Sequence, residues 1–443
     1  MSKRTHTPVS EIVHPYMPGS ARAAFAYPDF RRMWVGSFAS NIGTWMQNVV
    51  LPAYVYERTG KASIVALVSF AQLGPLLLLS IPAGVIADRF DRRRWLISMQ
   101  IVQLAFSALL APLAANDAAL PWLFLVAFGV GCGNALNAPA WAAMLPTLVR
   151  KVDLLGAISL NSAMINGSRV MGPVIVAILS QFGVTTSQFF LINAATYLFV
   201  ILALWRTHLP PVTKVAKEPA WRSFTSGLRI ARARPVLGRL LLTLFTFSLI
   251  SLPFVGLFPA VASLNFGIDE AAPTYKWLYA TWGLGACLGG LAIGTVFVAW
   301  DQRKLIQWGF VAFGASLAGF AIAREPIGAF TVGFVLGFFY FGTTTAMATI
   351  FQGRARDEER GRLMSLWFVA FGGTVAIGPL VFGPIMDAVG ARWVLLIGAA
   401  WSMVLAWWCN LGKLDRLHGL EDGNPALELD HATAFDEEGV TSG

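Results

Sequence analysis

Twelve apolar segments, each about 20 residues long, run through this chain of 443 residues. A helix needs about 20 apolar residues to cross the hydrocarbon core of a bilayer, so these segments predict membrane-spanning helices. Composition supports the prediction, because 56% of the residues are hydrophobic and only 13% are charged, whereas soluble domains carry about 25% charged residues. These features exclude a soluble enzyme and a disulfide scaffold, and they predict an all-α membrane protein.

The apolar segments form two sets of six, separated by a polar stretch at residues 206–239. The twelve expected spans are residues 33–56, 63–87, 95–115, 121–146, 157–181, 187–205, 240–262, 275–299, 305–323, 327–351, 363–388 and 394–411. We therefore expect five regions, which are a cytoplasmic N-terminal tail (1–32), an N-terminal six-helix bundle (33–206), a cytoplasmic central loop (207–239), a C-terminal six-helix bundle (240–412) and an acidic, disordered C-terminal tail (413–443).

Lysine and arginine gather on one side of the expected membrane. When the connections between spans are assigned alternately to the two sides, one side holds 27 of the 33 Lys and Arg residues and the other holds five, while Arg169 lies inside a span. The positive-inside rule assigns the basic side to the cytoplasm. We therefore expect a multi-pass protein of the cell inner membrane with both termini in the cytoplasm. The net charge of +9 then reflects topology, and no nucleic-acid partner is implied.

Two Gly-Pro pairs mark an internal repeat. Gly172-Pro173 lies in the fifth expected span, and Gly378-Pro379 lies 206 residues later in the eleventh. Asp91 and Asp301 precede the third and ninth spans and lie 210 residues apart. Similar intervals at two places indicate a duplicated six-helix unit, which many secondary transporters share. We expect the Gly-Pro pairs to break their helices or to pack them closely against neighbours.

Residues 84–94 carry the most specific motif of the chain. From Gly84 through Asp88 to Arg93, they resemble the Gly-x-x-x-Asp-Arg-x-Gly-Arg-Arg signature that follows the second helix of the major facilitator superfamily, with Asp91 in place of the second Gly. Residues 30–47, FRRMWVGSFASNIGTWMQ, are similar to the bacterial transmembrane secretion effectors, which include enterobactin-exporter-like and macrolide-efflux-like proteins. The resemblance implies the major facilitator fold, in which twelve helices form two pseudo-symmetric six-helix bundles. Because a single twelve-span chain can contain a complete transport path, we expect the protein to function as a monomer.

The same motif supplies a candidate conformational latch made of Gly84, Asp88, Arg92 and Arg93. Glycine lets neighbouring helices approach closely. We expect Asp88 to accept hydrogen bonds from the first amides of the eleventh span, near residues 361–363, where the helix dipole favours an anion. The family implies that such contacts form in one state of the transport cycle and break in the other. Alternatively, the arginines serve only as a positive-inside anchor.

Polar residues inside the expected spans are candidates for contact with a substrate. They are Asn41, Gln47, Asn48, Asn137, Asn166, Arg169, Tyr340 and Thr344. An arginine at the centre of a span costs about 2.5–3.5 kcal/mol, so it persists only with a partner or with water around it. Arg169 is therefore expected to be functional, although capping of carbonyls near Gly172 is an alternative. The amides are equally compatible with hydrogen bonds between helices.

Proton coupling has only two candidate carboxylates, Glu57 and Asp387, at the outer ends of the first and eleventh spans. Proton-driven transporters usually carry a titrating group within the membrane, and none of the 24 acids falls at the middle of an expected span. The family implies proton-driven export, but an electrogenic uniporter is left open.

The function that these features predict is export of a small amphipathic molecule by alternating access. A siderophore, a macrolide and another lipophilic compound are the candidate cargoes, and the partners are this molecule, the lipid bilayer and a proton. The sequence contains no nucleotide loop of the GxxxxGK[ST] type and no cluster of metal ligands within a span. We therefore expect no cofactor, no metal and no enzymatic activity. A lipid flippase and a membrane receptor or scaffold without transport are the alternatives.

Overall fold

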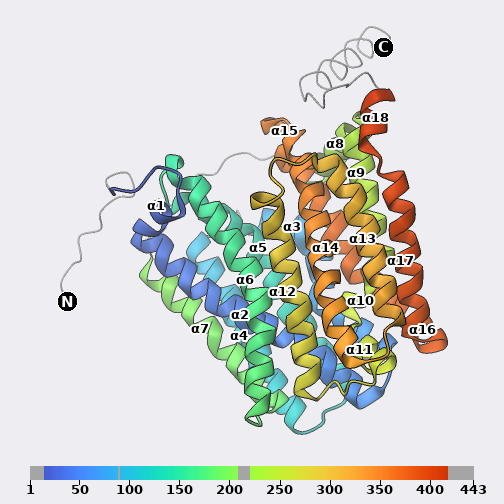
Figure 1. Ribbon diagram of the computed structural model, residues 1–443. Helices are drawn as coiled ribbons and strands as arrows, with labels where there is room; N and C mark the ends of the chain where they lie inside the picture. Colours follow the sequence, from blue (N-terminus) through green and yellow to red (C-terminus); the bar gives the residue numbers. More distant parts are fainter. Residues whose placement is uncertain (1–13, 88–89, 208–219, 418–443) are drawn as a thin grey trace, which may run out of the picture. The chain divides into compact units, whose positions relative to one another are not determined.

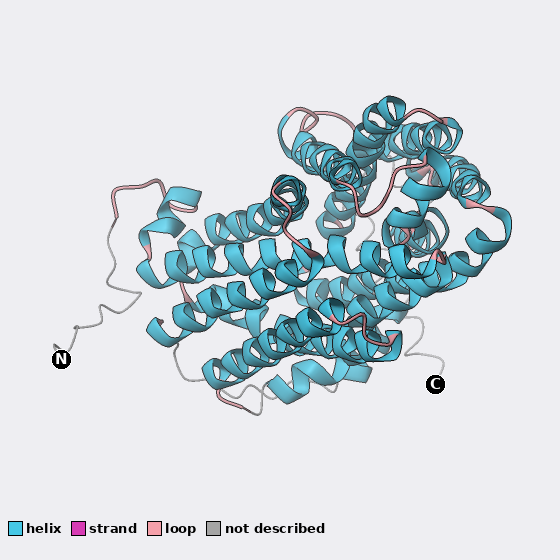
Figure 2. Ribbon diagram, turned by 90° about the horizontal axis from the view of Figure 1, so that it is seen from below, coloured by secondary structure: helices cyan, strands magenta, loops and turns pink. Residues whose placement is uncertain are grey.

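The computed structural model describes residues 14–87, 90–207 and 220–417, and within these ranges every regular element is helical (Figures 1 and 2). The first half contains α1 (Ala21–Ala26), α2 (Pro28–Thr59), α3 (Ala62–Ala87), α4 (Arg92–Ala115), α5 (Leu120–Met144), η2 (Leu145–Thr147), η3 (Lys151–Asp153), α6 (Leu154–Gln181) and α7 (Thr186–Arg206). The second half contains α8 (Ala220–Ala233), α9 (Pro235–Thr246), η4 (Phe247–Ser251), α10 (Pro253–Gly256), α11 (Phe258–Phe266), α12 (Pro273–Thr295), α13 (Gln302–Ile322), α14 (Pro326–Gly353), α15 (Asp357–Phe368), η5 (Val369–Gly373), α16 (Thr374–Val389), α17 (Ala391–Trp408) and α18 (Leu411–Leu417).

Among the described residues, ten helices are long and apolar enough to cross a membrane, or eleven if one bent pair counts as a single span. The bent pair is Thr225–Ala233 with Pro235–Ser251, whose axes differ by 116°. α2 covers the first expected span and has 32 residues, but it is not among the ten because polar side chains such as Asn41 and Gln47 dilute its apolar surface. The chain is thus a helical multi-span protein, and the count of twelve stays a prediction.

The seventh expected span is divided into short pieces, which the sequence analysis did not predict. α9 continues into the π-helical segment η4. Pro253 is the first residue of α10, and Pro259 is the second residue of α11. Proline lacks the amide that would continue a helix, so each one favours a new start. The eleventh expected span is likewise composed of α15, the π-helical η5 and α16.

The chain divides into two compact units that follow its two halves, apart from two short exchanges. Unit 1 contains residues 1–57, 70–217 and 271–280, and unit 2 contains residues 58–69, 218–270 and 281–443. The first turns of α3 therefore belong to unit 2, together with helices of the C-terminal half. Likewise, the first turns of α12 belong to unit 1.

The same packing pattern recurs within each unit (Figure 1). α4 packs against α5 and α7 in unit 1, and α13 packs against α14 and α17 in unit 2. Glycine permits a matching close approach in each, because a Cβ atom at Gly131 would lie 2.7 Å from the Ala71 carbonyl oxygen and one at Gly337 would overlap the Trp282 carbonyl oxygen. These two glycines lie 206 residues apart, as the Gly-Pro pairs do.

Asp91 and Asp301, which the sequence analysis paired, take the same structural role. The Asp91 Oδ1 atom accepts the Arg94 amide at 2.9 Å and caps α4. The Asp301 Oδ1 atom accepts the Arg303 amide at 2.9 Å and caps α13. An aspartate satisfies amides at a helix start that have no partner within the helix.

Candidate functional site

α2 and α6 approach each other closely at Gly172. A Cβ atom at this position would lie 2.5 Å from the Cβ atom of Trp45 and 3.0 Å from the Ile42 carbonyl oxygen. A small residue is required where two helix backbones come this near. α6 nevertheless runs unbroken through Pro173. The first Gly-Pro pair therefore packs two helices together and does not interrupt the helix that contains it.

Arg169 lies one turn before this contact and covers the ring of Trp45. The Arg169 Cζ atom is 4.7 Å from the ring centroid, and both side chains are half-buried. A guanidinium over an indole face is attracted by the ring quadrupole, by about 0.5–2 kcal/mol. The pair presents a planar group of N–H donors beside an apolar ring. Arg169 could be singled out from the sequence but Trp45 could not, because spacing alone does not tell which way a ring turns.

Asn41 and Asn166 also lie on these two helices, and each is half-buried. The Asn41 Nδ2 atom donates to the Ser37 carbonyl at 2.8 Å, and the Asn166 Nδ2 atom donates to the Ser162 carbonyl at 3.0 Å. Both amides are thereby held against their own helix, a common arrangement for short polar side chains. They stay candidates for substrate contact, and these hydrogen bonds fix the orientation of their side chains.

Asn48 and Asn137 each bind a glutamine on a neighbouring helix. The Asn48 Oδ1 atom accepts from the Gln72 Nε2 atom of α3 at 3.2 Å, and the Asn137 Oδ1 atom accepts from the Gln100 Nε2 atom of α4 at 3.4 Å. Both asparagines are half-buried, so part of each side chain is accessible. Hydrogen bonds between helices, one of the two roles predicted for these amides, are therefore present at both positions.

Gln47 is the one amide on α2 that is enclosed by other helices. Its side chain is 2% exposed, and its Oε1 atom accepts from the Ser107 Oγ atom at 2.9 Å and the Asn193 Nδ2 atom at 2.7 Å. These bonds join α2, α4 and α7 in a buried polar network, where each partner satisfies the others. We therefore leave Gln47 out of the surface proposed below for the substrate.

Tyr340 and Thr344 lie on α14 within the core of unit 2. They are 4% and 7% exposed. The Tyr340 ring stacks on Trp282 with centroids 5.8 Å apart and planes 15° apart, and the Thr344 Oγ1 atom donates to the Tyr340 carbonyl at 3.0 Å. Stacked rings of this kind stabilise a core. Substrate contact by these two residues stays a prediction.

The arginines of the loop motif bind carbonyls at helix ends. The Arg92 Nη1 atom donates to the Ala143 carbonyl at the end of α5 at 3.2 Å, and the Arg93 Nη2 atom donates to the Trp205 carbonyl at the end of α7. The last carbonyls of a helix have no partner within it and favour cations. These arginines therefore hold together the ends of three helices of unit 1.

The acidic part of the predicted latch cannot be placed. Asp88 lies outside the described residues, and Gly84 lies in the part of α3 whose surroundings are not described. α15 begins at Asp357, so the amides of residues 361–363 already lie within its helical ladder. An acid that binds the start of this helix would have to meet the amides near residues 357–360.

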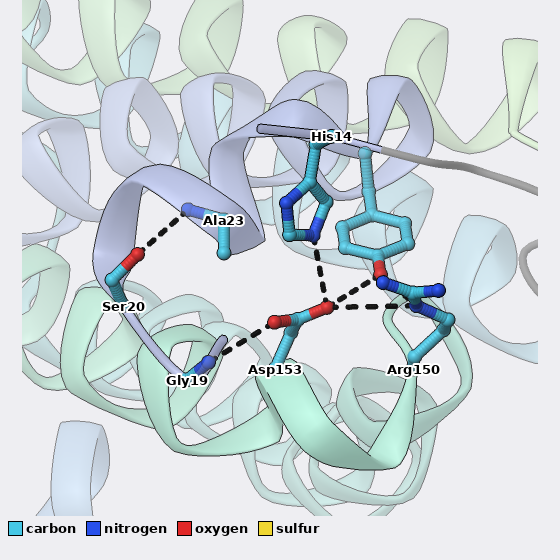
Figure 3. Close-up of polar contacts among 7 residues, drawn as sticks. His14, Gly19, Ser20, Ala23, Arg150 and Asp153 are labelled. Carbon is cyan, nitrogen blue, oxygen red and sulfur yellow. Dashed lines mark hydrogen bonds and ion pairs between the residues drawn. The ribbon is translucent and has the colours of Figure 1, made fainter. Parts of the chain in front are cut away.

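The most enclosed carboxylate among the polar contacts of unit 1 is Asp153, which the sequence analysis did not single out (Figure 3). Its side chain is 0% exposed and lies at the start of α6. The Tyr27 hydroxyl donates to Oδ2 at 2.6 Å, the Gly19 amide donates to Oδ1 at 3.0 Å, and the His14 Nε2 atom is 3.1 Å from Oδ2. The Arg150 Nε atom donates to the Tyr27 oxygen at 2.8 Å. This group, called the Asp153 cluster below, fastens residues 14–27 to α6.

The Asp153 cluster was missed because its residues resemble ordinary loop and cap residues. Asp153 precedes a helix and so has the sequence of an N-cap, but its carboxylate makes no capping bond to α6 and turns to the N-terminal segment. Burial raises the pKa of Tyr27 above its ordinary value of 10.0, and the hydrogen bond to Asp153 raises it further, against the effect of Arg150. The Tyr27 hydroxyl therefore stays protonated at neutral pH and keeps its hydrogen bond to Asp153.

Unit 2 has a counterpart of this cluster around Arg234, which directly precedes α9. The Arg234 side chain is 3% exposed, its Nη1 atom donates to the Arg354 carbonyl at 3.2 Å, and its Nη2 atom donates to the Glu359 carboxylate at 2.8 Å. Glu359 lies 206 residues after Asp153, and Arg234 lies 207 residues after Tyr27. Equivalent positions of the repeat thus carry a buried ionic or polar contact in each unit.

The two candidates for proton coupling have different surroundings. Glu57 is exposed near the end of α2. The Asp387 carboxylate, near the end of α16, accepts the backbone amides of Ala62 at 2.6 Å and Ser63 at 3.0 Å. Asp387 is therefore engaged with the first amides of α3.

Comparison with known families and proteins agrees with this architecture. The model of the family described as "Transmembrane secretion effector" matches residues 19–428. The staphyloferrin A transporter of Staphylococcus aureus is 25% identical over 366 residues, which are 80% of this chain and 88% of that protein. The macrolide efflux protein A of Streptococcus pyogenes is 23% identical over 389 residues, covering 83% of this chain and 92% of that protein.

Among solved structures, the chain is similar to a bacterial homologue of the human lysosomal transporter Spinster in an inward-facing, unoccupied conformation. The TM-score is 0.68 and the sequence identity is 15%, with 91% of this chain and 98% of that chain covered. At this identity the similarity establishes the fold alone. The helices described above therefore share the fold of that protein.

Proposed function

Because the chain belongs to the transmembrane secretion effector family, we propose that it exports a small amphipathic molecule across the bacterial inner membrane by alternating access. The observation that carries the proposal is the family match, which extends over residues 19–428 and therefore over both halves of the chain. The protein is a multi-pass membrane transporter and not an enzyme. The matched relatives are named for a siderophore and for macrolides, and cargoes of these two classes are the ones to test first.

The chemistry around Arg169 favours a cargo with anionic or oxygen-rich groups beside an apolar part. A guanidinium binds carboxylates and other anionic oxygens in a fixed, often bidentate geometry. The Trp45 ring below it offers an apolar face. Iron chelators bind their metal through such oxygens. We therefore place a siderophore ahead of a macrolide as the cargo, with Arg169, Asn41, Asn48, Asn137 and Asn166 as its proposed contacts in unit 1.

We propose further that the chain crosses the membrane twelve times, with both termini in the cytoplasm. α2 and the divided segment α9–α11 supply the spans beyond the ten that meet the criterion of length and hydropathy. Exposed Lys61 and exposed Lys151 then lie on opposite sides of the membrane. Labelling of single cysteines at these two positions from one side tests the arrangement, and equal labelling of both contradicts it.

Proton coupling through Glu57 or Asp387 stays part of the proposal for the driving force. An imposed pH gradient across vesicles is the direct test. Flux that is unchanged by the gradient contradicts proton coupling and leaves the transport proposal intact.

The experiment that tests the function uses the purified full chain in proteoliposomes. A citrate-based siderophore, a catecholate siderophore, a macrolide and a fluorescent phospholipid are each supplied on one side, and accumulation on the other side is measured with and without a pH gradient. We expect saturable flux of at least one siderophore, carried by the wild-type protein and lost in empty liposomes. Arg169→Lys should retain part of this flux, because the charge remains while the bidentate geometry is lost.

Other outcomes of the same assay decide between the alternatives. Flux of the phospholipid without flux of the soluble compounds would indicate a lipid flippase. Saturable binding of a compound without any flux would indicate a receptor. Transport of the macrolide alone would contradict the ranking of cargo classes but not the family function.

A further inference from the structure

The start of α3 is capped by a residue 325 positions further along the chain. The Asp387 Oδ1 atom accepts the Ala62 amide at 2.6 Å, and the Asp387 Oδ2 atom accepts the Ser63 amide at 3.0 Å. These are the first amides of α3, which have no acceptor within the helix. Lys61 precedes the helix and has no acceptor in its side chain, so the local sequence lacks the Ser, Thr, Asp or Asn that would normally provide the cap.

Close packing continues below the cap along the first turns of α3. A Cβ atom at Gly383, one turn before Asp387, would lie 3.0 Å from the Ala62 carbonyl oxygen and 3.0 Å from the Ala66 Cβ atom. Further along α3, the Ser69 Oγ atom donates to the Gly256 carbonyl at 2.9 Å. The start of α3 therefore contacts both α16 and α10, and all of these residues belong to unit 2.

We infer that Asp387 is a latch residue, whose bonds to α3 hold one end of the transport path closed and break when that end opens. The inference rests on the proposed function, because alternating access requires the N-terminal and C-terminal halves to part at one end and then at the other. α3 belongs to the first half of the sequence and α16 to the second, so the contacts of Asp387 join the two halves. A carboxylate bound to two helix-start amides is a charge-assisted contact that can form and break as a unit.

The arrangement is the reverse of the one predicted for Asp88. There, an acid after the end of the second span was expected to bind the start of the eleventh. Here, an acid near the end of α16, in the eleventh, binds the start of α3, the second. By the proposed topology Asp387 lies on the outer side, so its latch closes the path toward the outside.

A reporter of opening at this end tests the inference without any substrate. The native residues Cys132, Cys287 and Cys409 are replaced by Ala, and Ser69→Cys places a thiol at a position that is 4% exposed. Its labelling rate with a membrane-impermeant maleimide is measured in the full chain from the outer side. We expect Asp387→Ala to raise the rate about tenfold and Asp387→Asn to raise it less, because an amide oxygen can still accept one hydrogen bond.

The control is Glu325→Gln, which removes an exposed carboxylate in another loop that the topology assigns to the same side. This variant should label at the wild-type rate within about twofold. An unchanged rate in Asp387→Ala, with the protein inserted and monodisperse, overturns the latch. A loss of response to a pH gradient in Asp387→Asn without faster labelling also overturns it, and points to a proton carrier instead.

A second variant covers the case in which removing the carboxylate impairs folding. Ser63→Cys with Asp387→Cys should form a disulfide under oxidation, because the backbone of residue 63 lies within hydrogen-bond reach of the residue 387 side chain. The oxidised protein should stop transporting and recover with a reductant. Normal flux in the fully oxidised protein contradicts the latch but leaves the proposed function standing. Faster labelling in Asp387→Ala without flux of any tested cargo leaves the latch standing and contradicts the choice of cargo.

Discussion

Each half of the chain packs two helices together at the glycine of its Gly-Pro pair, but only the first half has a charged residue one turn before that glycine. Gly172 packs α6 onto α2, and Gly378 packs α16 onto the segment that includes η4, where its Cβ atom would lie 2.9 Å from the Leu249 carbonyl oxygen. Arg169 lies three residues before Gly172, whereas the equivalent position before Gly378 holds Val375. Duplication therefore accounts for the shared packing, and Arg169 gives the first half a charged group that the second half lacks at this position.

The polar contacts that hold the segment before each half also differ between the halves. Asp153 is fully enclosed and receives three donors, whereas Glu359 is 17% exposed at its side chain and binds Arg234. The most buried charge is thus the acid that directly precedes α6 in the first half, whereas in the second half it is the arginine that directly precedes α9. Both halves place an acid at this position of the repeat, and its donor is the neutral Tyr27 in the first half and the positively charged Arg234 in the second.

The largest loss of stability should follow from replacing the acid of the Asp153 cluster. Asp153→Ala leaves the Tyr27 hydroxyl and the Gly19 amide buried without their acceptor, and we expect a cost of about 3–5 kcal/mol. Arg234→Met should cost less, about 1–3 kcal/mol, because Glu359 is partly solvated. Thermal unfolding of each purified variant in detergent measures the difference. Equal losses would show that the two contacts are equivalent despite their different burial.

The next largest effect should be on the transport rate, and only for a substitution in the first half. Arg169→Ala removes a charge-assisted contact worth about 1.5–3 kcal/mol, which corresponds to about a 10- to 150-fold loss of transport rate. Val375→Ala at the equivalent position is the matched control and should transport within about twofold of the wild type. Flux measured per inserted protein decides the matter. A similar loss in both variants would remove the asymmetry between the halves.

The two packing glycines should behave alike. Gly172→Ala and Gly378→Ala both place a methyl group too close to a neighbouring helix, and overpacking of this kind costs about 2 kcal/mol. Gly361→Ala is the control, because a Cβ atom there meets no atom within 4 Å among the described residues. It should leave the melting temperature unchanged or raise it slightly. A tolerant Gly378 beside a sensitive Gly172 would mean that the repeat is preserved in sequence but not in packing.

The smallest effect concerns pH and the phenol of Tyr27. Since burial and the bond to Asp153 raise the pKa of Tyr27 above 10.0, the unfolded chain loses this proton before the folded protein does as the pH rises. The contribution of Tyr27 is therefore complete below pH 10 and declines above it. Tyr27→Phe should cost about 1 kcal/mol at neutral pH and should flatten the fall in melting temperature as the pH rises above about 10. An unaltered alkaline slope would argue against the environment described for this phenol.

Much of the fold could be predicted from the sequence because apolar length and charge placement act locally. The expected span 95–115 lies within α4, and the expected span 187–205 lies within α7. The division of the seventh span could not be predicted, because proline is tolerated in a membrane helix when neighbours satisfy the freed carbonyls. Which neighbours do so depends on tertiary packing.

A residue of the candidate site could be predicted where its placement within the membrane costs free energy. Arg169 was found because a charge within a span requires compensation. The contacts of Asp153 and Asp387 were not predicted, because their partners lie 126 and 325 residues away, at Tyr27 and Ala62. Neither spacing nor composition carries information about contacts at such distances.

The Asp153 cluster has a consequence for how the protein is made. His14 and Asp153 are separated by 139 residues, so the acceptor does not exist until the ribosome has synthesised four of the expected spans and the connection that follows them. Until then the segment of residues 14–27 lacks the carboxylate that it binds in the folded protein. Docking of this segment is therefore a late step in biogenesis, and it reports that the beginning of the fifth helix has reached its place.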